Sequence, residues 1–123
     1  MSCLAKFLAA RLRSFGFALE GLAFALKSEG NLRVHFVATA LVVALGIGFG
    51  VSRHEWAALV VAIGLVWVAE LLNTALEALC DYVQPKQAEP IKRIKDIAAA
   101  AVLLAALTAA TLGALVFWPY LFS

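Results

Sequence analysis

Charged residues are scarce in this 123-residue chain, in which Asp, Glu, Lys and Arg make up only 15% of the positions. A soluble domain averages about 25% charged residues, so this composition argues against an ordinary soluble protein. The net charge is only +2 at pH 7 and there is no basic tail, so nothing supports nucleic-acid binding. Cysteine is equally rare: Cys3 and Cys80 alone cannot build a structural zinc site, and nothing else suggests a disulfide framework.

Hydrophobic residues, by contrast, make up 64% of the chain and are concentrated in three stretches. Residues 34–52 carry no charge apart from a possible one on His35, and residues 97–122 carry none over 26 positions. The stretch 56–69 is shorter, but helix-forming residues extend it to residue 80. A membrane-spanning helix needs roughly 20 mostly apolar residues. The pattern predicts an all-α membrane protein with transmembrane helices over 34–52, 56–80 and 97–122.

The segments that connect these stretches differ in their content of Lys and Arg. Positive residues gather in residues 6–33 and in the segment 81–96, which we expect to be a loop. The short connection after Ser52 has only Arg53, close to Glu55. Lys and Arg mark the cytoplasmic side of a membrane protein. We therefore expect a multi-pass protein of the bacterial inner membrane with a cytoplasmic N-terminus and an external C-terminus.

Residues 4–28 form an element of their own before the first span. Leucine and phenylalanine recur there at steps of three and four, and charged residues recur every seven positions, at Lys6, Arg13, Glu20 and Lys27. This spacing predicts an amphipathic helix on the inner membrane surface, although a helix that packs on the soluble side of the protein fits the same pattern. With the three spans, it would complete a single membrane-embedded domain over residues 1–123.

The third span contains a row of small residues at steps of four, Ala101, Ala105, Ala109 and Gly113. Small residues let helix backbones approach one another closely in lipid. We interpret this row as a helix-packing face and not as a functional site.

Polar residues interrupt the second span at regular intervals: Glu70, Asn73, Glu77 and Asp81 follow at steps of three, four and four. At 100° per residue they fall within about 80° of one another, so they line one face of a helix. Ionisable residues are costly inside a membrane and usually face a cavity or a partner. Two glutamates with an amide between them favour a metal or acid–base site. For Asp81, a functional role and a simple position at a helix end outside the membrane fit the sequence equally well.

The depth of this polar face separates the roles of its two glutamates. Residues 56–69 cover about 21 Å of a hydrocarbon core about 30 Å thick, so Glu70 should lie in the inner leaflet near a lipid hydroxyl. Burial there would make its carboxylate a better base. Glu77 should lie about 10 Å closer to the cytoplasm, where its oxygens could hold a divalent cation.

These residues match the needs of phosphoryl transfer, which requires a base, Mg²⁺ on the phosphates and a cation that offsets phosphate charge. Glu70 can act as the base, and Glu77 with Glu29 can bind the metal. Lys95 stands at the cytoplasmic start of the third span and can supply the cation. Asp96 can cap that helix, orient Lys95 or contact a nucleotide. No GxxxxGK[ST] motif is present, which excludes a P-loop.

Three blocks of the sequence carry a family resemblance. The first is residues 69–81, AELLNTALEALCD, which match the pattern Glu-x-x-Asn-[Ser/Thr]-Ala-x-Glu-x-x-x-Asp. The second is Lys95-Asp96 followed by a helix of small residues. The third comprises Glu20-Gly21 and residues 29–35, with Arg33 and His35. In these blocks and their spacing, the chain resembles the small prokaryotic membrane diacylglycerol kinases, a family that includes undecaprenol kinases.

The resemblance implies a fold, an assembly and a reaction. It implies three membrane helices with an N-terminal surface helix, and a homotrimer whose active sites are shared between subunits. The implied reaction transfers the γ-phosphate of Mg-ATP to a lipid hydroxyl, of diacylglycerol or undecaprenol. Glu70 would be the catalytic base and Asn73 a supporting residue. The implied contacts to metal and nucleotide are Glu29, Glu77, Lys95, Asp96 and Phe17.

The chain departs from the family pattern in ways that keep other functions open. Lys86-Gln87-Ala88 replaces a Glu-Tyr-His segment that contacts nucleotide in many members, and Phe17 replaces a tyrosine of some members. The alternatives are a non-catalytic small membrane interaction protein, a small transporter and an inactive family member. Each of them predicts that the protein transfers no phosphate to lipid.

Overall fold

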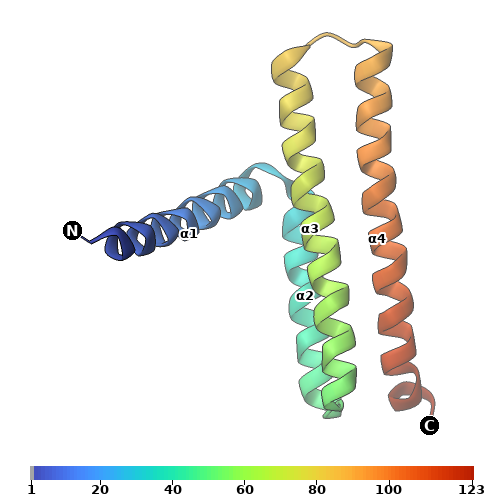
Figure 1. Ribbon diagram of the computed structural model, residues 1–123. Helices are drawn as coiled ribbons and strands as arrows, with labels where there is room; N and C mark the ends of the chain where they lie inside the picture. Colours follow the sequence, from blue (N-terminus) through green and yellow to red (C-terminus); the bar gives the residue numbers. More distant parts are fainter. Residues whose placement is uncertain (1) are drawn as a thin grey trace.

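The computed structural model describes residues 2–123 as four helices, and this part of the chain contains no β-strand. The helices are α1 (Cys3–Ser28), α2 (Gly30–Phe49), α3 (Arg53–Val83) and α4 (Glu89–Phe122), as Figure 1 shows. The last three are each long and apolar enough to cross a membrane. The predicted all-α architecture with three membrane-spanning helices is therefore confirmed.

A tight turn reverses the chain between α2 and α3. Gly50 adopts the left-handed conformation with φ +64°, which favours glycine because it has no Cβ. The next helix begins with a capping box, in which the Ser52 hydroxyl accepts from the Glu55 backbone N–H at 3.2 Å. The Glu55 carboxylate accepts in return from the Ser52 backbone N–H at 2.9 Å. These local bonds satisfy the backbone groups that would otherwise be left free at the start of α3.

The segment that the sequence analysis expected to be a loop, residues 81–96, is mostly helical. α3 continues to Val83 and α4 begins at Glu89, so the connection is only residues 84–88. Pro90 lies in the first turn of α4, where its missing N–H costs no helical hydrogen bond. The prediction of a long loop is wrong because charged residues end an apolar span without ending a helix.

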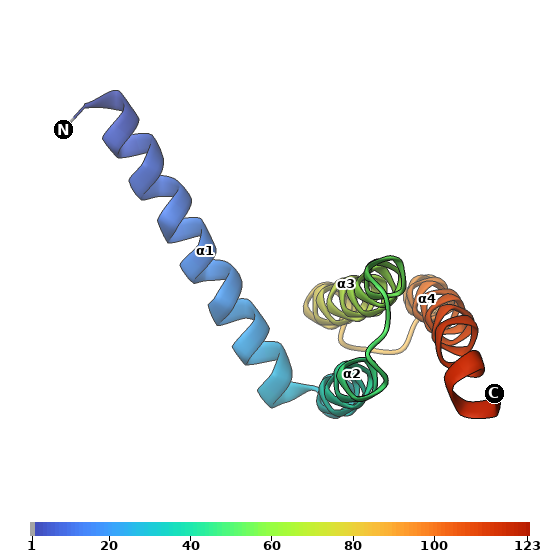
Figure 2. The ribbon, with the colours of Figure 1, turned by 90° about the horizontal axis from the view of Figure 1, so that it is seen from below.

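The three long helices pack unequally (Figures 1 and 2). α4 lies antiparallel to α3 and contacts it extensively, whereas the contact of α2 with α3 is smaller. A core cluster lies at the end near the α2–α3 turn and contains Val51, Leu59, Val116 and Phe117. Beside it, Trp56 packs so closely on Gly46 that a Cβ there would lie 2.6 Å from the indole ring.

The row of small residues in α4 is only partly covered: Ala105 is buried, Ala109 and Gly113 are half-buried, and Ala101 is exposed. Ala105 and Ala101 line a cavity shared with α3. Ala109 and Gly113 line a second cavity, which α2 and α3 also border. Small side chains thus lie where α4 meets its neighbours.

The first helix leans away from the bundle, and its C-terminal end is the part that reaches the other helices (Figures 1 and 2). Ala25 is its only buried residue, and Leu12, Phe15 and Phe24 are largely exposed. This exposed apolar surface suits contact with lipid or with another protein chain. The placement of residues 4–28 on the membrane surface stays a prediction.

Candidate active site

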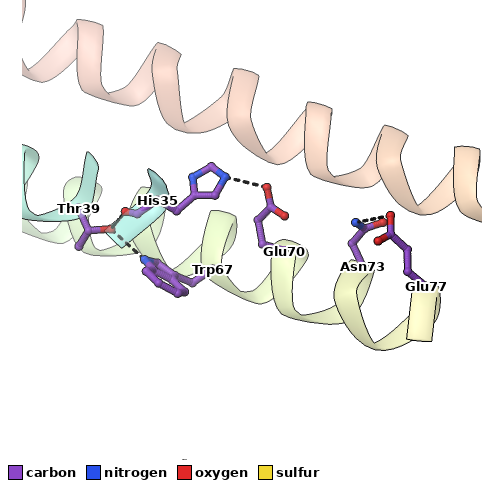
Figure 3. Close-up of polar contacts among 6 residues, drawn as sticks. All are labelled: His35, Thr39, Trp67, Glu70, Asn73 and Glu77. Carbon is purple, nitrogen blue, oxygen red and sulfur yellow. Dashed lines mark hydrogen bonds and ion pairs between the residues drawn. The ribbon is translucent and has the colours of Figure 1, made fainter. Parts of the chain in front are cut away.

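The middle of the bundle holds a buried carboxylate. Glu70 on α3 is the only polar or charged residue that is buried within residues 2–123, with 6% of its surface exposed. Its Oε1 lies 2.7 Å from Nε2 of His35 on α2, as Figure 3 shows. A carboxylate in an apolar interior needs such a partner, because burial of an unpaired charge costs several kcal/mol.

The next turns of α3 carry two further polar side chains on the same side of the helix (Figure 3). Asn73 donates from Nδ2 to Oε1 of Glu77 over 3.3 Å. The other amide atom, Asn73 Oδ1, is buried and has no hydrogen-bond partner among the described residues. A buried carbonyl oxygen without a partner, next to a carboxylate, is a donor set that suits a hard cation such as Mg²⁺.

The ends of α3 and α4 near the short connection are joined by an ion pair. Lys95 on α4 donates from Nζ to Oδ1 of Asp81 on α3 over 2.7 Å. Asp81 therefore helps to join the two helices. Asp96 pairs with Lys92 one turn away, also at 2.7 Å. Asp96 therefore neither orients Lys95 nor caps α4, whose N-cap residue is Ala88. Both pairs are exposed, and such pairs contribute only about 0–1 kcal/mol to stability.

A cleft of about 480 Å³ lies at this end of the bundle, against the connection between α3 and α4. Lys86, Lys92 and Lys95 line it together with Gln87 and the two acidic residues Glu89 and Asp96. With three ammonium groups against two carboxylates, the cleft has a positive excess, which suits an anionic ligand such as a polyphosphate. The cleft brings the Lys86-Gln87-Ala88 segment together with Lys95 and Asp96.

The structure does not bring all the candidate residues of the sequence analysis together in one chain. Phe17 lies on α1 and its side chain is exposed, so it is not part of this site within one chain. Glu29 lies at the junction of α1 and α2, where its N–H bonds to the Ala25 carbonyl at 2.9 Å. No group of three or more His, Cys, Asp or Glu residues within 2–123 is placed to hold a metal.

One residue of the site, His35, received no role from sequence reasoning. It is the only ionisable residue in the otherwise uncharged stretch 34–52, and this was the signal that could have identified it. A lone histidine in a membrane span is costly and usually has a partner. The sequence alone does not say that this partner is Glu70.

Fold and site together define a helical membrane protein with a carboxylate buried among its spanning helices. A family model described as prokaryotic diacylglycerol kinase matches residues 16–117. Undecaprenol kinase of Bacillus subtilis (strain 168) is 34% identical over 89% of each chain. Diacylglycerol kinase of Escherichia coli (strain K12) is 29% identical over 89% of each chain. A diacylglycerol kinase of Synechocystis sp. is 36% identical over 91% of this chain and 65% of its own length.

The match covers most of the chain, so this protein belongs to the prokaryotic diacylglycerol kinase family, a family of lipid kinases. Its three apolar spans and its family make it a bacterial membrane protein.

Proposed function

We propose that this protein transfers the γ-phosphate of Mg-ATP to the hydroxyl group of a membrane lipid, diacylglycerol or undecaprenol. The observation that carries the proposal is the buried Glu70 carboxylate, held by His35 between two membrane-spanning helices. The family match and the names of the relatives support a lipid kinase. A lipid kinase needs a base in contact with the acceptor hydroxyl, and a buried carboxylate between spanning helices can meet this need.

The position of Glu70 along α3 suits a lipid acceptor. It follows 14 apolar residues, 56–69, which cover about 21 Å of a hydrocarbon core about 30 Å thick. The hydroxyl of a membrane lipid lies near the edge of that core. Since no water-soluble acceptor is concentrated at this depth, a lipid alcohol is the natural nucleophile.

The reaction follows from this placement. Glu70 accepts the proton of the lipid hydroxyl on Oε2, the oxygen that His35 leaves free. The lipid oxygen forms a bond to the γ-phosphorus while the bond from that phosphorus to the bridging oxygen breaks. ADP leaves with the electron pair, and the proton on Glu70 later passes to water. General base catalysis of this kind contributes about 10²- to 10⁴-fold to the rate.

Asn73 and Glu77, which follow Glu70 on the same side of α3, fit a magnesium ion. Glu77, the free Asn73 Oδ1 and, from the junction of α1 and α2, Glu29 would hold it, and all three offer oxygen ligands. A bound Mg²⁺ would offset the negative charge of the phosphates. Two protein carboxylates suffice because Mg²⁺ usually completes its shell with water and substrate phosphates.

The lysine-lined cleft is the proposed nucleotide site. Lys95 and Lys92 would exchange their contacts with Asp81 and Asp96 for contacts with phosphate oxygens. Both pairs are exposed and weak, so this exchange costs little free energy. Lys86 would add a positive charge in place of the Glu-Tyr-His segment of other members.

We further propose a homotrimer with shared active sites and a cytoplasmic N-terminus. The exposed apolar surface of α1 supports the assembly, because in an oligomer this helix can cover a neighbouring chain. Phe17 would then complete a neighbour's site and not its own. The positive charges at residues 6–33 and near the α3–α4 connection support the orientation.

The decisive experiment measures transfer of labelled phosphate from Mg-ATP to lipid in bicelles. Diacylglycerol and undecaprenol are offered in parallel, and Glu70→Gln is the inactive control. Transfer that is lost in this variant supports the proposal, and the preferred lipid assigns the acceptor. Absence of transfer to either lipid, from protein that stays folded, refutes it and favours a non-catalytic role.

A further inference from the structure

We infer that His35 is a positioning residue of the reaction, which holds the Glu70 carboxylate oriented so that its second oxygen meets the acceptor hydroxyl. This inference rests on the proposed role of Glu70 as the base. It assigns a function to a residue on a different helix, 35 positions away in sequence.

The contact between His35 and Glu70 is short and involves only one of the two carboxylate oxygens. A carboxylate that is ready to accept a proton can only accept hydrogen bonds, so the proton between Nε2 and Oε1 belongs to His35. At 2.7 Å the distance is that of a charge-assisted hydrogen bond, which is about twice as strong as a neutral one. The bond occupies Oε1 and leaves Oε2 free.

Nothing else among the described residues replaces this partner. Within residues 2–123, His35 provides the only hydrogen bond to the Glu70 side chain. Asn73, one turn along α3, bonds to Glu77 instead. On α4 no charged residue occurs from Ile97 to Phe122. Without His35, the buried Glu70 side chain would lose this hydrogen bond, and nothing would fix the direction of its two oxygens.

A second polar contact joins α2 to α3 close to the histidine–glutamate pair and does not involve the imidazole. Thr39, one turn after His35, donates from Oγ1 to the His35 backbone carbonyl at 2.7 Å. The same Oγ1 accepts from Trp67 Nε1 on α3 at 2.8 Å. Figure 3 shows the Thr39–Trp67 contact beside the His35–Glu70 contact, both between α2 and α3. Thr39 and Trp67 thus provide a matched control, because they also join α2 to α3 but do not contact Glu70.

The experiment measures kcat and the KM for ATP, with melting temperature in detergent, for His35→Leu, His35→Gln and Thr39→Val. We expect His35→Leu to lower kcat about tenfold to a hundredfold without raising the KM for ATP, since a general base loses part of its contribution. His35→Gln keeps an N–H donor and should recover most of kcat. Thr39→Val should lower the melting temperature but leave kcat close to that of the wild type.

A double-mutant comparison tests whether His35 acts through Glu70. In a Glu70→Gln background, His35→Leu should cause no further loss of the residual rate, because residues that act as a unit are not additive. The inference is overturned if His35→Leu keeps the wild-type kcat, or if Thr39→Val lowers kcat equally. In both cases the proposed function stands, provided that Glu70→Gln is inactive. A wild-type protein that transfers no phosphate overturns both.

Discussion

Glu70→Gln should separate catalysis from stability in this protein. Glutamine has the shape of glutamate, and its carbonyl oxygen can still accept the hydrogen bond from His35 Nε2, so the α2–α3 contact persists. The variant also removes a charge that is only 6% exposed, which relieves its desolvation cost. We therefore expect an unchanged or higher melting temperature. An amide cannot take up the hydroxyl proton, so kcat should fall about 10²- to 10⁴-fold, or roughly 3–5 kcal/mol.

A control variant on the same helix should lower stability without affecting catalysis. Glu55 lies at the other end of α3, where it caps the helix and accepts a hydrogen bond from Tyr120 Oη at 2.6 Å. Glu55→Ala removes both hydrogen bonds, so it should lower the melting temperature and leave kcat unchanged. The assays are phosphate transfer in bicelles and thermal unfolding in detergent. Glu70→Gln with more than a tenth of the wild-type kcat would refute the reasoning, and so would a protein that loses its fold.

Three further variants test the cation site, the nucleotide cleft and the packing of α2. Glu77→Gln should abolish the thermal stabilisation by Mg-ATP. For the wild type this stabilisation is about 2.7 kcal/mol at a ligand concentration of 100 Kd. If the variant is stabilised as much as the wild type, Glu77 is not a metal ligand. Lys95→Met should raise the KM for ATP roughly tenfold with little change in kcat, and an unaltered KM would place the nucleotide elsewhere. Gly46→Ala puts a Cβ 2.6 Å from Trp56, and such overpacking typically costs about 1–3 kcal/mol. It should lower the melting temperature, whereas Gly48→Ala, with nothing within 4 Å, should not; equal effects would contradict the packing argument.

The number of helices and the all-α fold class could be predicted from the sequence because they depend on local composition. A run of apolar residues long enough to cross the bilayer leaves few alternatives to a helix, since every backbone group must be bonded within the segment. The spacing of Glu70, Asn73 and Glu77 likewise places them on one side of α3, because helix geometry is local. The family resemblance, found by the same motif, is confirmed by the match over residues 16–117.

The ends of α3 and α4 that flank their connection could not be located in this way. Charge content marks where lipid ends, but a helix can continue into water. Residues 81–83 and 89–96 are helical, and only 84–88 connect them. The pairing of Lys95 with Asp81, and of Asp96 with Lys92, depends on this extension.

The sequence by itself therefore determined the helices, their apolar spans and the polar face of α3. Only the tertiary structure decided that His35 meets Glu70, because the apolar residues of α2 favour no side of the helix and so do not indicate which side faces α3. In lipid, the contact between two such helices is selected by close packing and by the few polar groups that must find partners. The Thr39–Trp67 contact and the histidine–glutamate pair are the polar contacts that join α2 to α3 on this side.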